Sequence, residues 1–130
     1  MTLGAGSTVR LCTYPAGQAA GRASAPVFCL PHSLRCLAAR RPRLAATLRD
    51  PRSGRKMQLF TNAPGVQFYS GNFLDGSLVG KGGALYGKHA ALCLETQGFP
   101  DAVNQPNFPT VILRPGMQYR HVVKYQFSAD

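Results

Sequence analysis

Residues Tyr119 to Phe127 constrain the fold most, because apolar and polar side chains alternate there with a period of two. The alternation assigns Tyr119, His121, Val123, Tyr125 and Phe127 to one face and Arg120, Val122, Lys124 and Gln126 to the other. This pattern is typical of a β-strand. The chain also has 14 glycines and 10 prolines in 130 residues, and these leave no convincing helix of ten residues after Leu44. We therefore predict an all-β protein, with a sandwich as its architecture.

Further strands are expected on both sides of short turn sequences. The Asp50-to-Gly54 segment combines Asp-Pro with a following glycine, which is turn chemistry, and predicts a β-hairpin between its flanking segments. The expected strands are Leu44–Arg49, Arg55–Asn62, Val66–Ser70, Ala90–Thr96 and Thr110–Leu113. The glycine-rich segment 71–87 and the proline-rich segment 99–109 are predicted to be loops, and Arg114-Pro115-Gly116 is predicted to be a turn.

The N-terminal third of the chain has a different character from the rest. Residues 1–49 contain seven arginines, no lysine and no acidic residue, so they carry most of the net charge of +10. Prolines and glycines interrupt every apolar period in residues 1–43, and we expect this segment to be a disordered tail. The chain is thus divided into an unassigned basic segment, 1–43, and a folded portion, 44–130.

Several functional classes are disfavoured by spacing alone. The four cysteines form no C-x-x-C pair, and no histidine lies at zinc-finger spacing from them, so we expect no metal site. Gly76 to Lys81 resembles a phosphate-binding loop, but it has three residues between its glycines and lacks the Ser or Thr after the lysine. No apolar run approaches the roughly 20 residues that cross a bilayer. Free thiols favour a reducing compartment, and we expect a cytoplasmic protein without a membrane partner.

Two polar residues on predicted strands are candidates for chemistry. Glu95 ends the apolar strand before the proline-rich loop, where a partly desolvated carboxylate could act as a general base. Gln67 offers one acceptor and two donors, which suits the hydroxyls of a sugar. From residue chemistry alone, the favoured readings are a solvated acid at the end of a strand for Glu95 and a buried amide bonded to the backbone for Gln67.

Three longer strings carry a resemblance to a known family. Pro64 to Gly76 reads PGVQFYSGNFLDG, Cys93 to Asn104 reads CLETQGFPDAVN, and Phe108-Pro109 precedes a strand and the turn LRPG. In this order and spacing, the strings resemble the C-terminal part of aldose 1-epimerases of the galactose mutarotase type. The resemblance covers the chain from near Leu44 to its end.

The resemblance implies a fold, an activity and a site. The fold is part of a large β-sandwich with a sugar-binding cleft. The implied activity is interconversion of the α and β anomers of galactose and glucose by acid–base ring opening, without a cofactor. The family's general base falls on Glu95, and its sugar-contacting glutamine falls on Gln67. The family's histidine acid, second histidine and binding aspartate lie upstream of the matching strings, and His89 and His121 match positions without a known catalytic role.

The missing acid leaves alternatives open. One is a truncated, inactive chain that acts at most as a weak carbohydrate-binding or interaction module. Another is a basic nucleic-acid-binding module, which rests only on the arginine-rich segment Arg40-Arg41-Pro42-Arg43. That segment has no interleaved aromatic residues, so we expect no specific nucleic-acid partner. Unpaired strand edges are expected to allow self-association.

Overall fold

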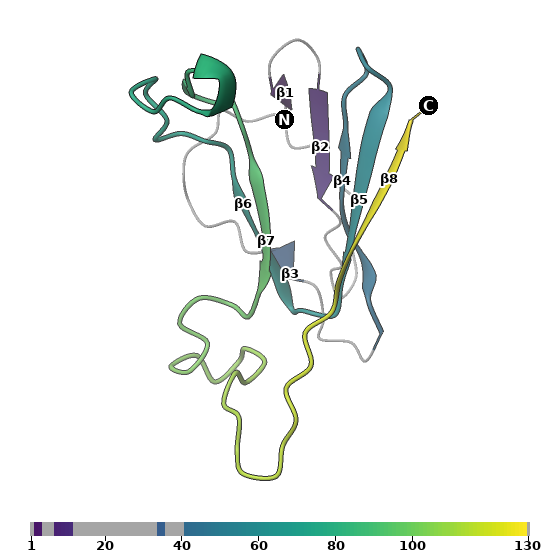
Figure 1. Ribbon diagram of the computed structural model, residues 1–130. Helices are drawn as coiled ribbons and strands as arrows, with labels where there is room; N and C mark the ends of the chain where they lie inside the picture. The colour runs from purple at the N-terminus through teal and green to yellow at the C-terminus, as the bar shows by residue number, and fades with distance from the viewer. Residues whose placement is uncertain (1, 4–6, 12–33, 36–40, 130) are drawn as a thin grey trace.

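The computed structural model describes residues 2–3, 7–11, 34–35 and 41–129, with side-chain environments given for residues 41–129. Two β-sheets make up this part of the chain (Figure 1). One sheet has five strands in the order β1-β2-β4-β5-β8, and the other has three in the order β3-β6-β7. The only helical segment among the described residues is a short 3-10 turn, Lys81–Gly83. The prediction of an all-β class is therefore confirmed.

The five-stranded sheet is built around the predicted hairpin. Strands β4, Arg43–Arg49, and β5, Arg55–Thr61, pair in antiparallel fashion. Asp50 closes the turn: its carboxylate accepts hydrogen bonds from the backbone N–H of Arg52 and the hydroxyl of Ser53, while its own N–H donates to the carbonyl of Arg55. Short polar side chains favour such turns because they bond to the backbone nearby.

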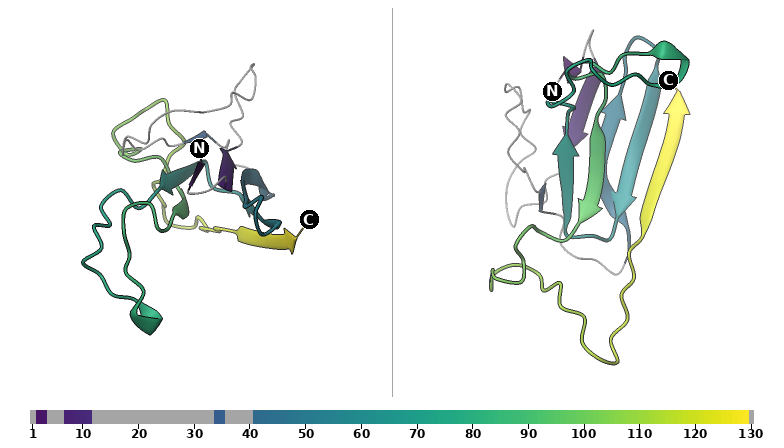
Figure 2. Two further views of the ribbon diagram at one scale, coloured as in Figure 1. Left: turned by 90° about the horizontal axis from the view of Figure 1, so that it is seen from above. Right: turned by 60° about the vertical axis from the view of Figure 1, so that its left-hand side comes forward.

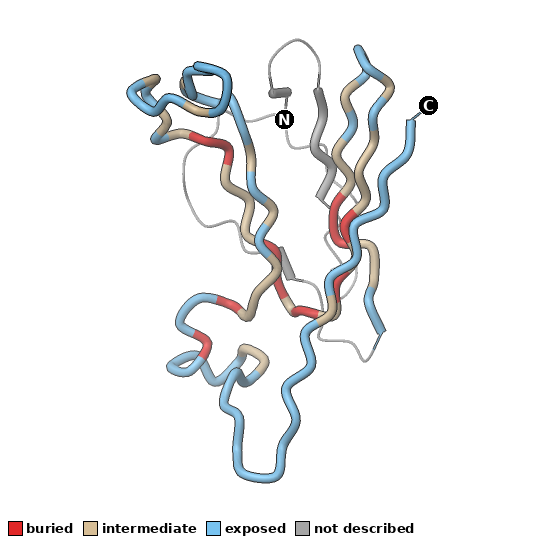
Figure 3. The backbone as a smooth tube through the Cα atoms, viewed as in Figure 1, coloured by how far each residue is buried: buried red, intermediate tan, exposed pale blue. Residues whose placement is uncertain are grey.

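The hydrophobic core lies between the two sheets. A register shift between Leu44 and Ala46 marks a β-bulge, which explains why two consecutive residues, Ala45 and Ala46, are both buried. They pack with Leu59 of β5 and Val66 of β6, and the partly buried Leu94 completes the cluster. Figure 3 shows the buried segments where the two sheets approach each other, with most of the surface exposed around them.

The last strand, β8, Val123–Ala129, forms one edge of the five-stranded sheet (Figure 2). It begins four residues later than the predicted start at Tyr119. Its partner β5 ends at Thr61, and the backbone N–H of the next residue, Asn62, still donates to the carbonyl of Val122. The side chain of Asn62 also donates to the carbonyl of Arg120 and accepts from the N–H of Val122.

The three-stranded sheet holds β6, Gly65–Tyr69, and β7, Cys93–Gln97, in antiparallel register. The loop between them is the predicted glycine-rich segment, with one isolated bridge between Val79 and Leu85. After β7 the chain forms irregular turns, in which Phe99 packs on Phe108 with ring centroids 5.0 Å apart. Gly65 lies against this pair, because a Cβ there would meet the Phe99 ring at 3.1 Å.

The predicted strand Thr110–Leu113 is not formed. Val111, Ile112 and Leu113 are about half exposed, and the Thr110 hydroxyl accepts the N–H of Ile112. This local side-chain bond competes with strand pairing, and no neighbouring strand offers a partner along this segment in the described structure. The predicted turn that follows is present: Met117 N–H donates to the Arg114 carbonyl, and Gly116 has a φ of 81°.

Three short strands lie within residues 1–43, where no element was expected. They are β1, Thr2–Leu3, β2, Ser7–Leu11, and β3, Leu34–Arg35. Strand β2 pairs with β4, and β3 pairs with β6. The prediction missed them because the free edges of β4 and β6 supply partners that a local pattern does not reveal. The expected disorder of the other residues in this segment, and cysteines 12, 29 and 36, lie outside the described residues.

Candidate functional site

The two candidate residues are direct cross-strand partners. Gln67 on β6 and Glu95 on β7 pair in the antiparallel register. Directly opposite residues point to the same face, with Cβ atoms about 4.5–5.5 Å apart. Their sequence neighbours Val66 and Leu94 contribute to the core. Because successive side chains alternate between faces, Gln67 and Glu95 lie on the face turned away from the core.

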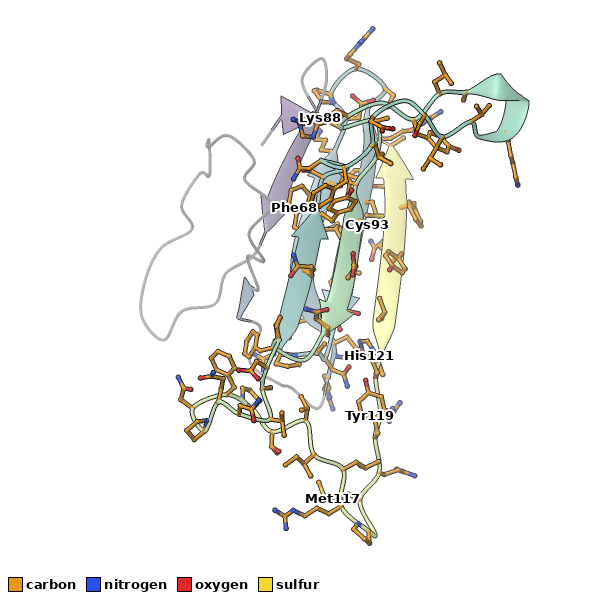
Figure 4. All side chains as sticks on the ribbon, turned by 90° about the vertical axis from the view of Figure 1, so that its left-hand side faces the viewer. Phe68, Lys88, Cys93, Met117, Tyr119 and His121 are labelled. Carbon is orange, nitrogen blue, oxygen red and sulfur yellow. The ribbon has the colours of Figure 1, made fainter. Side chains whose placement is uncertain are left out.

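The same face carries an aromatic group next to the pair. Tyr69 follows Gln67 by two residues on β6, and its register partner is Cys93 of β7, which is labelled in Figure 4. The Tyr69 ring stacks on Phe73, with centroids 6.2 Å apart and planes 19° from parallel. The Tyr69 hydroxyl also accepts the backbone N–H of Phe73. The face thus combines a carboxylate, an amide and an aromatic surface, and this combination suits a sugar ring.

Glu95 differs from its expected setting in two respects. It is the central residue of β7 rather than the end of a strand, since the strand starts at Cys93 and continues to Gln97. It is also exposed rather than partly desolvated. Within residues 41–129 no hydrogen-bond or ion-pair partner occupies its carboxylate, because no other described element covers this face of β7. Gln67 is half-buried, and its Nε2 lies 3.4 Å from the Phe68 carbonyl.

The loop between β6 and β7 is fixed at its neck by His89. The His89 Nδ1 lies 2.9 Å from the carbonyl oxygen of Ser70. A carbonyl can only accept, so Nδ1 carries the proton in this contact. The backbone N–H of His89 donates to the carbonyl of Gly71. These contacts join the two ends of the loop that connects β6 and β7.

This role of His89 was not foreseen from the sequence. The visible structural signal is its left-handed backbone, with a φ of 64°, which is uncommon for a residue other than glycine. Nothing in the local sequence pattern predicts it. The described hydrogen bonds of His89 lie at the neck of the loop, and none of them is to Gln67 or Glu95.

His121 lies on the other side of β7 from Glu95. Its Nε2 is 2.9 Å from the hydroxyl of Thr96, and Thr96 follows Glu95 and so points to the opposite face. Figure 4 shows His121 on the segment that leads into β8. His121 therefore does not face the candidate base, and the described side-chain hydrogen bond of His89 is to the Ser70 carbonyl.

Two aspartates lie in the loops on either side of β7. Hydrogen bonds from the hydroxyl and then the N–H of Ser77 lower the pKa of Asp75. The side chains of Gln105 and then Asn104 lower the pKa of Asp101 in the same way. Both carboxylates are solvent-exposed and are held in their charged form by local hydrogen bonds, which makes them poor proton acceptors near neutral pH.

Metal and membrane features are absent from the part of the chain that the structure describes. No group of three or more histidine, cysteine, aspartate or glutamate side chains converges there as a metal site requires. None of the helical segments described is long and apolar enough to cross a membrane.

Comparison with known proteins identifies the family. The sequence model of the aldose 1-epimerase family matches residues 25–126. The chain is 52% identical over 101 residues to galactose mutarotase of Mus musculus and 62% identical over 76 residues to that of Homo sapiens. It is 40% identical over 77 residues to aldose 1-epimerase of Escherichia coli strain K12. The chain therefore belongs to the aldose 1-epimerase family, as the strings around Gln67 and Glu95 indicated.

The fold gives the same result. The structure matches a crystal structure of a GalM/aldose epimerase homologue from C. elegans with a TM-score of 0.66 and 32% sequence identity, over 77% of this chain.

The shared region is a limited part of each relative. It covers 78% of this chain and 28% of the mouse protein, and 58% of this chain and 22% of the human and bacterial proteins. It covers 30% of the C. elegans chain. The family match begins upstream of Leu44, so it is longer than the three strings alone. The domain boundary between residues 43 and 44 stays a prediction.

Proposed function

We propose that this chain acts in the interconversion of the α and β anomers of aldose sugars, with galactose and glucose as substrates. Glu95 is the general base and Gln67 a sugar ligand. The observation that carries the proposal is the register of β6 and β7, which sets the two side chains opposite each other on one exposed face. The names of the relatives, galactose mutarotase and aldose 1-epimerase, support the same chemistry.

The chemistry begins with the anomeric hydroxyl. The Glu95 carboxylate takes the proton from the C1 hydroxyl as the bond between C1 and the ring oxygen breaks, and the ring oxygen takes a proton from water. The sugar opens to the free aldehyde. Rotation about the C1–C2 bond presents the other face of the carbonyl, and the reverse proton transfers close the ring as the other anomer. No electrons are exchanged with a redox partner, so the step needs no redox cofactor.

Gln67 and the aromatic surface hold the sugar during this cycle. An amide can accept from one hydroxyl and donate to another, which fixes the orientation of the ring relative to Glu95. A positioned general base contributes roughly 10²- to 10⁴-fold to a rate. Free carboxylate oxygens on Glu95, unoccupied by any described neighbour, leave it available for this proton transfer.

A second candidate is a binding module without catalysis. The observation that favours it is that the side chains of the described histidines bond outside the candidate pair: His89 bonds to the Ser70 carbonyl and His121 to Thr96. The proton for the ring oxygen must then come from solvent or from a group outside this pair. In this case the chain would bind an aldose on the β6–β7 face without speeding its mutarotation.

Polarimetry tests the proposal directly. The full chain is added to freshly dissolved α-galactose, and the decay of optical rotation is compared with buffer. We expect a faster decay that returns to the buffer rate in Glu95→Gln, because an amide cannot accept the proton. The control is Asp75→Asn, which makes the same change of charge in a loop and should retain the activity. Absence of acceleration by the unmodified chain would contradict catalysis and favour the binding module.

The proposal includes the location of the protein. Cys93 is a free, exposed thiol. Such a thiol is compatible with a reducing compartment, and we propose the cytoplasm. Fractionation of cells followed by detection with an antibody against the chain would find it in the cytosolic fraction, and recovery with membranes or in the medium would contradict this.

A further inference from the structure

The outer edge of β8 is the most exposed strand surface of the described chain. All seven residues of β8 are exposed, and among the described strands β8 pairs only with β5 (Figure 3). Phe127 is 73% exposed and Tyr125 is 51% exposed. A strand edge with unpaired backbone groups is a template for another strand.

The backbone contacts of Asn62 show which groups of β8 are free. The N–H and carbonyl of Val122 both point toward the β5 side, where they meet Asn62. In an antiparallel ladder, residues alternate in the side to which their N–H and carbonyl point. The groups of Lys124, Gln126 and Ser128 therefore point to β5. Those of Val123, Tyr125, Phe127 and Ala129 point outward from the sheet.

The side chains of the same strand form an apolar row that continues the core. Tyr125 is the register partner of the fully buried Leu59, so both lie on the face that packs against the second sheet. Val123 and Phe127 share this face with Tyr125. The row is exposed because the three-stranded sheet does not extend over β8.

We propose that the chain forms a symmetric dimer in which β8 pairs with β8 of a second copy, antiparallel and centred on Gln126. This register pairs the whole strand. Tyr125 then lies opposite the second copy's Phe127, Val123 opposite its Ala129, and Lys124 opposite its Ser128. A two-fold interface of this kind uses the same surface on both copies.

The strand is complementary to itself in this register. Aromatic cross-strand pairs stabilise a sheet, and the two-fold axis makes the Tyr–Phe pair twice. The only charged side chain of β8 that the structure describes is Lys124, and its counterpart in the second copy lies four residues away, or about 13 Å along the strand. A register centred on Lys124 would instead set two like charges opposite each other. The apolar rows of both copies become one strip on the core side of a continuous sheet.

The association state of the full chain tests the proposal. Sedimentation equilibrium at 0.15 M salt should show a dimer. Tyr125→Lys should weaken the association and raise the dimer dissociation constant at least tenfold. The matched control is Tyr119→Lys, which adds the same charge at a tyrosine that is 74% exposed but lies before β8. A monomeric chain, or equal dimerisation of both variants, would overturn the proposal.

Cross-linking tests the register independently of that variant. In a background with the four native cysteines replaced by serine, Gln126→Cys should form an intersubunit disulfide on mild oxidation. Gln126 forms a non-hydrogen-bonded pair across the axis, with Cα atoms about 4.5 Å apart, which is within disulfide range. Ser128→Cys is the control, because its two copies are about 13 Å apart along the strands. Equal cross-linking of both variants would overturn the register, and no cross-linking of either would overturn the interface.

Discussion

The side chain of Asn62 extends the pairing of β5 and β8 beyond the point where the two backbones separate. Its amide donates to one carbonyl and accepts from one N–H, so it replaces a backbone unit of the ladder. An Asn→Ala change there leaves two backbone groups without their partner. The approach of the chain to β8 is thereby held by one residue just beyond the end of β5, 58 and 60 positions away from the groups that it contacts.

We predict that Asn62→Ala lowers the free energy of unfolding by about 1–2 kcal/mol, because two hydrogen bonds are lost at a half-buried site. Urea denaturation followed by circular dichroism measures this change. The control is Asn107→Ala, an exposed loop substitution, which should stay within about 0.5 kcal/mol of the unmodified chain. Equal effects of the two substitutions would show that Asn62 does not support β8.

Asp101 gives a prediction about pH. The side chains of Gln105 and then Asn104 lower its pKa in the folded chain. A carboxyl whose pKa is depressed by folding adds stability above its unfolded pKa, and this stability is lost as pH falls through the folded pKa. In Gln105→Ala, NMR titration of the Asp101 carboxyl should show a raised pKa. The pKa of Asp75 is lowered by hydrogen bonds from Ser77 instead, so it should not change in Gln105→Ala. A change in the pKa of both aspartates would contradict the assignment of the Asp101 shift to its hydrogen bond with Gln105.

The long loop of the β6–β7 hairpin is held at its neck. Gly71 has a φ of 70°, and a Cβ at this position would lie 2.9 Å from the carbonyl oxygen of Ala91. The position therefore needs glycine both for its backbone conformation and for the close approach of the returning chain. Together with the hydrogen bonds of His89, this contact joins the two ends of the loop.

We predict that Gly71→Ala destabilises the chain more than Gly76→Ala. Both glycines have positive φ angles, but a Cβ at Gly76 meets nothing within 4 Å. Gly76→Ala should lower the free energy of unfolding by about 1–2 kcal/mol, because alanine is strained at a positive φ. Gly71→Ala should lower it by more, because the new Cβ would also clash with the carbonyl oxygen of Ala91. Thermal denaturation compares the two variants. Equal costs would mean that the contact with Ala91 does not hold the neck of the loop.

The strands differ in how far the sequence could predict them. The β4–β5 hairpin was foreseen because Asp50 and Gly54 carry their own turn chemistry. The start of β8 and the absence of a strand at Thr110–Leu113 were not foreseen. Both depend on whether another strand lies beside the segment, and a local sequence pattern does not contain this information. The pairing of Gln67 with Glu95 likewise follows from a strand register across a long loop. The family resemblance supplied the roles of these two residues, while local patterns supplied neither their pairing nor their exposure.

At the level of the whole chain, two surfaces of the described part are exposed. The shared region covers 28% of the mouse relative, and the two described sheets bury only a small core between them. The β6–β7 face and the β8 edge are both left open among the described residues. We propose an aldose as the ligand of the first and another copy of the chain as the partner of the second.

The most direct test of the central claim is an NMR titration of the full chain with galactose. We expect the backbone amides of β6 and β7 and the side-chain amide of Gln67 to shift together, and we expect Glu95→Gln to weaken the response. Amides of β8 should stay unchanged by the sugar. Shifts confined to other surfaces, or no shifts at high galactose concentration, would contradict the assignment of the Gln67–Glu95 face as the sugar site.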